Sequence, residues 1–158
     1  MFGNNEFDKY LHAVMERGGH EARQDGSATI EAQHLLLAVA AQDGTAPQRL
    51  LAEAGLDARA IRDALDREFE QSLAIAGVSI ANLPGPSRHS TKAPSVGATG
   101  KLVLERMTTT YPKRELRQAN VLLGILQAEV GTVPRALALA GADRVALVTR
   151  VHESLEDR

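Results

Sequence analysis

Residues 33–39, QHLLLAV, and residues 119–125, ANVLLGI, are two versions of one phrase, in which polar positions precede an aliphatic run. The stretches that follow them are also alike, LLAEAGLDARAI at 50–61 and ALALAGADRVAL at 136–147. Matching positions in the two copies are 86 residues apart. Self-similarity at a fixed offset is the signature of an internal repeat. The sequence therefore contains one structural unit twice.

The composition is that of a globular domain with an aliphatic core. The chain has 158 residues, of which 44% are hydrophobic and only 3% are aromatic, with no Trp. Its core must be built from Leu, Val, Ile and Ala. The absence of Cys excludes disulfides, thiolate metal sites and cysteine catalysis. A net charge of −2 provides no overall attraction to nucleic acid or to an anionic membrane.

Helical periodicity divides the first copy into four segments. Apolar residues recur at helical spacing from Phe7 to about Gln24, and residues 30–42 are apolar on nearly every side, as in a central buried helix. Pro47 suits the first turn of a short third helix, and Gly55 suits its left-handed C-terminal cap. Asp57 can then cap a fourth helix.

The fourth helix, residues 58–73, is expected to bury one stripe, formed by Ile61, Leu65 and Phe69. The second copy repeats the order of the first, with helices expected at 100–107, 119–130, 133–141 and 143–156. No sustained alternation indicates a strand. The sequence therefore predicts an all-α fold of two pseudo-repeated four-helix units.

These units divide a single domain, residues 1–158, into repeat one at 1–76 and repeat two at 98–158. The stretch between them, 77–97, is rich in Pro, Gly and Ser and reads as a linker. The chain start has neither a basic region nor an apolar run, so it is no signal peptide. Nor does any apolar segment approach the roughly 20 residues of a membrane span. We expect a cytoplasmic monomer.

In these phrases the chain resembles the N-terminal domain of the Clp ATPases, especially the ClpC type, which consists of two four-helix repeats. The family's phrase is Thr-Glu-His followed by Leu-Leu-Leu-Gly-Leu, and here AQHLLLAV and ANVLLGI occupy it. LLAEAGLD and ALALAGAD occupy the family's Leu-Gly turn, and the opening MFG and the KLVLE at 101–105 are also similar. The resemblance covers essentially the whole chain. It implies a domain that binds protein substrates and adaptors.

Two departures from the family pattern affect the expected ligand. Gln33 and Ala119 stand where the family has glutamates that help to hold phosphoarginine-tagged substrates. A carboxylate accepts paired hydrogen bonds from a guanidinium, which an amide or a methyl group cannot do. We therefore expect phosphoarginine binding to be lost. The run 103–120 is also three residues shorter than its counterpart 14–34, so a ligand held there fits differently.

The resemblance also points to a groove between the repeats. Phe2, Val96, Lys101 and Glu105 match positions where the family's N-domains receive peptides, adaptors and, in actinobacterial members, cyclic-peptide antibiotics. Relatives commonly carry an aromatic residue where this chain has Val96. The alternative is an ordinary surface, on which Phe2 packs against the chain start and Lys101 and Glu105 form a surface ion pair that stabilises little.

The histidines suggest other chemistry that competes with this interpretation. His12, Glu16 and His20 share a helix face and could ligate zinc, although no fourth ligand is evident and a solvated face explains them as well. His34, beside an aliphatic run, is expected to be a buried structural histidine rather than a catalytic base. Asn120 fills its place in the second copy, which suits packing or capping.

No arrangement of charged residues stands out as catalytic. Asp66, Glu68 and Glu70 alternate with Arg67 and are expected to form a solvated helix face. The basic stretch 111–116, YPKREL, is too small for a nucleic-acid interface.

The sequence thus predicts a non-catalytic protein- or peptide-binding module of the Clp system, acting as an accessory, an adaptor or a ligand-sequestering decoy. It contains no G-x-x-x-x-G-K-[ST] loop, so we expect neither ATP hydrolysis nor a cofactor. Expected partners are proteins or peptides, including Clp ATPase or protease components and cyclic-peptide antibiotics. The first alternative is an excised N-terminal domain of a ClpC-like unfoldase. The second is a metal-binding or enzymatic protein that uses His12 and His20.

Overall fold

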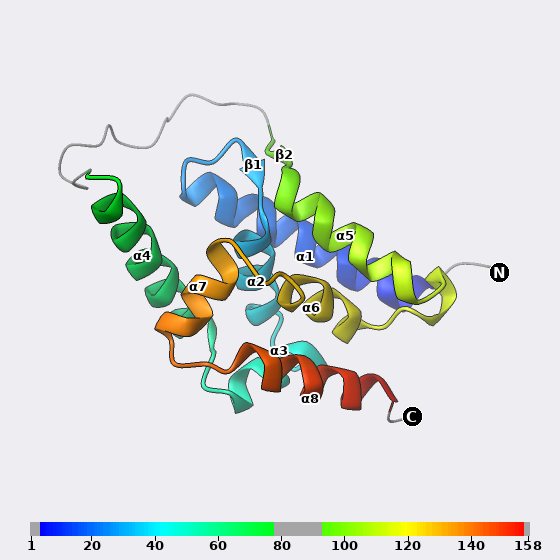
Figure 1. The fold of residues 1–158 in the computed structure, drawn as a ribbon. Coiled ribbons are helices and arrows are strands. Elements are labelled where there is room, and N and C mark those ends of the chain that lie inside the picture. Colours follow the sequence, from blue (N-terminus) through cyan, green and yellow to red (C-terminus); the bar gives the residue numbers. More distant parts are fainter. Residues whose placement is uncertain (1–3, 78–92, 157–158) are drawn as a thin grey trace.

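The computed structural model describes residues 4–77 and 93–156. The described elements are, in chain order, α1 (Asn5–Gln24), β1 (Thr29–Ile30), α2 (Ala32–Ala40), α3 (Ala46–Glu53), α4 (Ala58–Ile75), β2 (Ser95–Val96), α5 (Ala98–Thr110), the 3-10 turn η2 (Lys113–Glu115), α6 (Gln118–Leu126), α7 (Thr132–Leu139) and α8 (Arg144–Glu156) (Figure 1). Apart from the two short strands, this is the predicted all-α fold.

The repeat is visible in the helix boundaries. Helices α2, α3 and α4 begin at residues 32, 46 and 58, and α6, α7 and α8 begin 86 positions later, at 118, 132 and 144. The third helix of each copy ends at a left-handed glycine, Gly55 with φ +77° and Gly141 with φ +76°. In each copy the N–H of the residue after that glycine donates to a helix carbonyl, at 2.8 Å in the first and 2.9 Å in the second. This closure requires a conformation that glycine adopts without strain.

The last helix of each copy begins at an aspartate cap. The Asp57 carboxylate accepts the N–H of Ala60 at 2.8 Å, and the Asp143 carboxylate accepts the N–H of Ala146 at 3.1 Å. Each satisfies a backbone donor that the helix cannot satisfy itself. The first helices differ more, because α1 has 20 residues and α5 only 13.

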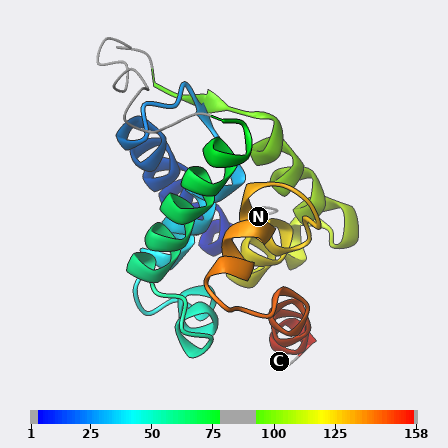
Figure 2. The ribbon, with the colours of Figure 1, turned by 60° about the vertical axis from the view of Figure 1, so that its left-hand side comes forward.

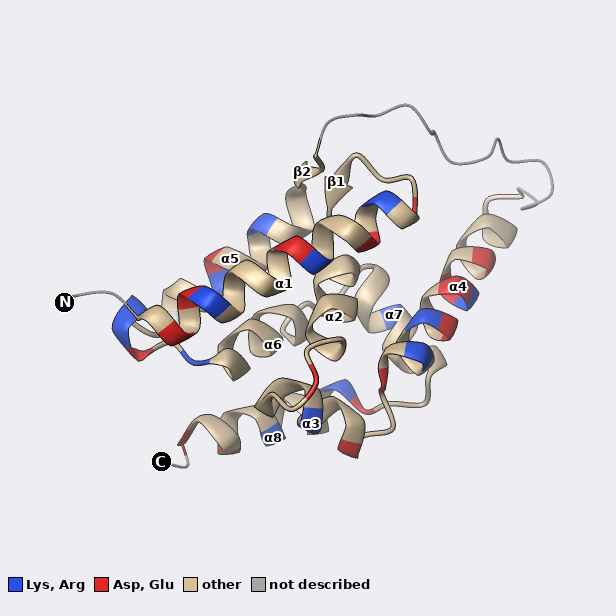
Figure 3. Ribbon diagram, turned by 180° about the vertical axis from the view of Figure 1, so that it is seen from behind, with Lys and Arg blue, Asp and Glu red and all other residues tan. Residues whose placement is uncertain are grey.

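The core is centred on α2 and α6, which contact each other and contain no charged residue (Figure 3). Leu36 and Leu122, which match in the repeat, are both 0% exposed. Burial of such a side chain contributes about 1.5–3 kcal/mol. Helix α1 packs on α2 and α5 packs on α6, so each central helix is covered by the first helix of its own copy.

Helices of the two copies also contact each other. Helix α4 packs against α7 of the second copy, as Figure 2 shows, and α8 contacts α3 of the first. The copies therefore share one core. The predicted repeat and linker boundaries remain predictions, and residues 78–92 of the linker lie outside the described residues.

A parallel pairing of β1 with β2 joins the start of α2 to the start of α5. The Glu31 carboxylate accepts the backbone N–H of Thr99 at 3.1 Å and its hydroxyl at 2.7 Å. The same hydroxyl oxygen accepts the N–H of Ala32 at 2.8 Å, so each helix start is capped by a residue of the other. A Cβ on Gly100 would lie 2.5 Å from the carbonyl oxygen of Ile30, so this close approach requires glycine.

The structure corrects the prediction for α4. Phe69, predicted to be buried, is 51% exposed, and the buried residues of the helix are Ile61, Ala64 and Glu68. The helix is rotated relative to the predicted stripe because it packs on α7, where Arg135 forms an ion pair with Glu68 at 3.0 Å. The prediction of a wholly solvated acidic face was therefore wrong at Glu68.

Helix α6 is shorter than the predicted 119–130 and ends at Leu126. Its terminal region is closed by a side chain, because the Arg144 guanidinium donates to the Leu126 carbonyl at 2.7 Å.

Candidate functional site

A pocket with a volume of about 310 Å³ lies between α2, α4 and the start of α7, and we call it pocket A. Its lining residues are Asp25, Ser27, Gln33, His34, Leu37, Arg62, Leu65, Asp66, Glu68, Phe69 and Thr132. Three of these side chains are large and apolar, and several of the others carry charge. Pocket A is therefore suited to a ligand with both apolar and charged parts.

A second pocket, pocket B, has a volume of about 520 Å³ and lies where the starts of α1 and α6 meet η2 and the end of α8. Its lining residues are Asn4, Glu6, Phe7, Ala46, Arg114, Glu115, Leu116, Arg117, Gln118, Ala119, Ser154 and Leu155.

The two pockets are related by the repeat. Gln33 lines pocket A and Ala119 lines pocket B at the matching position, and Phe69 and Leu155 match in the same way. The repeat has therefore produced two pockets of the same origin, and their side chains have diverged. The most visible divergence is that Phe69 is 51% exposed and Leu155 only 6%.

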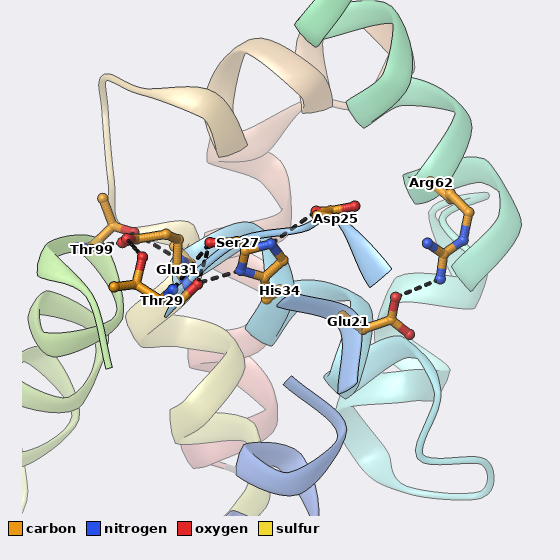
Figure 4. Close-up of polar contacts among 9 residues, drawn as sticks. Glu21, Asp25, Ser27, Thr29, Glu31, His34, Arg62 and Thr99 are labelled. Atoms are coloured by element: carbon orange, nitrogen blue, oxygen red, sulfur yellow. Dashed lines mark hydrogen bonds and ion pairs between the residues drawn. The ribbon is translucent and has the colours of Figure 1, made fainter. Parts of the chain in front are cut away.

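His34 lines pocket A, and both of its ring nitrogens form hydrogen bonds (Figure 4). Its Nδ1 accepts the N–H of Glu31 at 2.9 Å, so the proton of the neutral ring lies on Nε2, which donates to the Asp25 carboxylate at 2.9 Å. The side chain is 2% exposed. The predicted buried, hydrogen-bonded structural histidine is confirmed, and both ring nitrogens are already engaged.

Arg62 lines pocket A, but its guanidinium forms an ion pair with a carboxylate outside the pocket. Its guanidinium donates to the buried Glu21 carboxylate at 2.7 Å (Figure 4). Arg17 donates to the other oxygen of that carboxylate at 2.9 Å. Burial raises the pKa of Glu21, but the hydrogen bonds from Arg62 and Arg17 outweigh it and hold that pKa below its ordinary value. The ion pair between Arg62 and Glu21 links α4 to α1.

The remaining charge of pocket A is acidic. Glu68 is neutralised by Arg135, but Asp66 forms no ion pair with any described residue, and the Asp25 side chain is 52% exposed. Burial raises the pKa of Asp66, and Asp25, among other carboxylates, raises it further against the opposing effect of Arg62. Pocket A is therefore electrostatically suited to a cation.

Pocket B has a different chemistry at the matching helix start. Arg117 precedes α6, its N–H donates to Asn120 Oδ1 at 2.7 Å, and its guanidinium donates to the carbonyl of Leu155. Asn120 thus has the capping role that His34 has in the first copy, as expected. Glu6 and Glu115 balance the two arginines in the lining, so pocket B has no excess of either charge.

Only some of the site residues predicted from the sequence line a pocket in the structure. Gln33 and Ala119 line the two pockets, and Ala119 is 4% exposed. Val96 is half-buried in β2, and Lys101 and Glu105 are exposed on α5, with no ion pair formed between these two described residues. These three line neither pocket A nor pocket B. Phe2 lies outside the described residues.

The candidate metal ligands form only a partial cluster. His12 Nε2 lies 3.6 Å from the Glu16 carboxylate, and both side chains are exposed. Within residues 4–77 and 93–156, no group of three His, Asp or Glu side chains is arranged to hold a metal ion. In the same ranges, none of the helices has the length and apolar character needed to cross a bilayer.

Residues 6–90 match the sequence profile of the Clp repeat (R) N-terminal domain. The chain belongs to this family. The Clp repeat fold extends beyond the matched residues, because the structure is similar to the N-terminal domain of the caseinolytic protease associated chaperone ClpD from Arabidopsis thaliana. That similarity has a TM-score of 0.65 at 18% identity, over 93% of this chain and 92% of the other. At this identity it shows the fold alone, and no curated protein matches the sequence.

The sequence did not identify Asp25, Asp66 and Phe69 as site residues of this Clp repeat domain. Asp25 directly follows α1, and Asp66 and Phe69 lie on α4. Only Phe69 has a sequence signal, because its repeat counterpart Leu155 differs from it in size and shape.

Proposed function

We propose that this Clp repeat domain is a non-catalytic module that binds protein segments. The observation that carries the proposal is the duplicated pocket, in which matching helix starts present Gln33 and Ala119 to two cavities of one Clp repeat fold. Pockets with apolar walls and a few fixed polar groups bind side chains of limited size. Two such pockets on one rigid core suit two points of a single extended polypeptide.

The proposed role is that of an accessory, an adaptor or a ligand-sequestering decoy of a ClpC-type system. The alternative is the N-terminal domain of a ClpC-like unfoldase, which would deliver the same ligands to an ATPase. Co-purification with a Clp ATPase and the extent of the reading frame distinguish the two roles. An accessory binds a Clp ATPase or competes with it for a substrate, and an N-terminal domain is encoded in one reading frame with a phosphate-binding loop.

Phosphoarginine is not the proposed ligand. Gln33 is half-buried and uncharged, and Ala119 is buried and apolar, so neither position supplies the carboxylate that pairs with a guanidinium. Cyclic-peptide binding would depend on a separate surface, the proposed groove of Phe2, Val96, Lys101 and Glu105. The exposed Leu102, at 42%, adds apolar area on the same stretch of α5.

The test is a thermal-shift and calorimetry panel with four ligands: phosphoarginine, a cyclic peptide that binds ClpC N-domains, zinc, and carboxymethylated lactalbumin as an unfolded polypeptide. We expect the unfolded polypeptide to bind, and phosphoarginine to be silent. A ligand at a hundredfold excess over its Kd stabilises the folded state by about 2.7 kcal/mol.

A response to the cyclic peptide would add the α5 groove to the binding surface. Binding of zinc alone, with an increase in melting temperature, would overturn the proposal in favour of a metal site at His12 and His20. If neither the cyclic peptide nor the lactalbumin binds, the proposal is also overturned.

A further inference from the structure

We propose that α4 is a movable wall of pocket A. In its second position α4 lies along α2, Leu65 and Phe69 are buried, and the pocket is closed. Helix α8 of the second copy already occupies the equivalent position on α6, so the repeat supplies the template. This inference goes beyond the proposed function, because it concerns the shape of pocket A and does not depend on which ligand the pocket binds.

The last helices of the two copies pack on different partners, although they begin at matching residues. Helix α8 packs mainly on α6, the central helix of its own copy. Helix α4 packs mainly on α7 of the other copy and less on its own central helix, α2 (Figure 2). One repeated architecture therefore holds its last helix in two different positions.

The two helices carry the same apolar stripe, but only α8 buries all of it. The stripe of α8 is at most 6% exposed at each of its three positions, Leu147, Val151 and Leu155. The matching residues of α4 are Ile61, Leu65 and Phe69. Ile61 is buried, but Leu65 is half-buried and Phe69 is 51% exposed. Helix α4 thus keeps an apolar face that its present position leaves in the wall of pocket A.

Two ion pairs hold α4 in its present position. Arg62 donates to the Glu21 carboxylate of α1 at 2.7 Å, and Arg135 of α7 donates to the Glu68 carboxylate at 3.0 Å. The two carboxylates are 2% and 7% exposed, so movement of α4 would take a cation away from each of them in a buried place. Because loss of such a partner is costly, the pairs favour the open pocket.

The second copy carries neither of these charges on its last helix. Helix α8 has Val148 at the position of Arg62 and Ser154 at the position of Glu68. Val148 packs against the hydrophobic core, whereas the Arg62 side chain is 43% exposed. The last helix is therefore displaced in the copy with the charged pair of residues, and it lies on its central helix in the copy without them.

The position of α4 results from a balance between apolar burial and these ion pairs. Burial of Leu65 and Phe69 would favour the closed position, in which their side chains fill the cavity of about 310 Å³. The ion pairs of Arg62 and Glu68 oppose it. Arg67 adds an exposed hydrogen bond to α7, which contributes less than a buried pair. Removal of the two charges should therefore close the pocket.

The experiment uses a tryptophan at position 69 as the reporter, because the chain contains no Trp of its own. Phe69→Trp is made alone, and also together with Arg62→Val and Glu68→Ser, which give α4 the residues of α8. We expect acrylamide to quench the single variant readily. In the triple variant the quenching constant should fall at least threefold and the emission maximum should move to shorter wavelength, because the indole becomes buried.

The matched control combines Phe69→Trp with Arg59→Val and Glu70→Ser. Arg59 and Glu70 are exposed on α4 and form no ion pair among the described residues, so this control should be quenched like the single variant. An unchanged quenching constant in the triple variant, or an equal fall in the control, would overturn the inference. Since no ligand is present, either result leaves the proposed function intact.

A ¹H–¹⁵N spectrum confirms that each variant is folded. If the triple variant does not fold, Phe69→Trp with Glu68→Ser alone decides the question, because the released Arg135 side chain is 57% exposed and can be solvated where it lies. We expect a smaller fall in quenching for this variant than for the triple variant. Quenching equal to that of the single variant would then overturn the inference.

Discussion

Glu31 and Arg117 occupy the same position in the two copies, directly before a central helix, and they carry opposite charges. Glu31 bonds to Thr99 at the start of α5, whereas the Arg117 guanidinium bonds to the Leu155 carbonyl at the end of α8. The backbone is extended at both positions. The side chain at this one position therefore decides which neighbouring helix is tied to the central helix.

The same comparison extends to the pockets. In pocket A the matching wall position is an exposed Phe69 beside free carboxylates, and in pocket B it is a buried Leu155 beside balanced charges. A duplicated backbone has thus been kept as scaffold, and the two binding surfaces have diverged on it. Four experiments test this comparison, in order of decreasing expected effect.

The largest effect is expected for Gly100→Ala at the junction of the copies. The new Cβ would lie 2.5 Å from the backbone oxygen of Ile30, which cannot move without opening the strand pair. Overpacking of this kind costs about 3 kcal/mol, measured by urea unfolding. Gly19→Ala is the control, since its Cβ meets nothing closer than 3.8 Å and should stabilise α1 by about 0.5–1 kcal/mol. Equal stability of the two variants would contradict the close approach.

The wall positions of the pockets should respond differently to truncation. Leu155→Ala removes a side chain that is 6% exposed and should cost about 2 kcal/mol in the free energy of unfolding. Phe69→Ala removes one that is 51% exposed and should cost less than about 1 kcal/mol. Calorimetric melting of both variants gives the ranking. A larger loss at Phe69 would mean that its ring is a core residue.

The Glu31 junction should depend on pH. Burial raises the pKa of Glu31, but hydrogen bonds from Thr29 and Thr99 outweigh it, so the pKa lies below its ordinary value of 4.5. The carboxylate therefore contributes stability above pH 4.5 that is lost as the pH falls through the folded-state pKa. We expect Glu31→Gln to cost about 1–2 kcal/mol at pH 7 and less below pH 4.5.

Urea unfolding between pH 3 and pH 7 measures this difference, and Glu153→Gln, at an exposed position, controls for net charge. The same loss at every pH would show that the Glu31 carboxylate contributes through its shape alone.

The smallest effects are expected at the repeated caps. Asp57→Ala and Asp143→Ala each remove one hydrogen bond to a helix start and should each cost about 1 kcal/mol. Because the two caps share one geometry, the two losses in unfolding free energy should agree closely. A loss at only one of them would mean that the copies differ in backbone as well as in side chains.

Much of this fold can be predicted from the sequence because the same short signals mark helix ends in both copies. Gly55 and Gly141 end helices through their own conformation, and Asp57 and Asp143 begin helices with their own side chains. These signals act within a few residues, so they can be read without knowledge of the partner helix.

The candidate site follows from contacts that are distant in sequence. Periodicity predicts a buried stripe of Ile61, Leu65 and Phe69, but α4 packs on α7 so that Glu68 is buried and Phe69 lies in the wall of pocket A. Ile61 belongs to two neighbouring stripes of α4, one through Ala64 and Glu68 and one through Leu65 and Phe69, and periodicity alone favours the second because it is the more apolar. Asp25 and Asp66 line one cavity only because the end of α1 and the middle of α4 border it.

The central claim is most directly tested by ¹H–¹⁵N spectra of the whole chain titrated with carboxymethylated lactalbumin. The account predicts chemical-shift changes that cluster on the linings of pockets A and B, led by Gln33, Asp66 and Phe69. Absence of shifts at saturating polypeptide, or shifts confined to surfaces away from both pockets, would contradict the assignment of these pockets as binding sites.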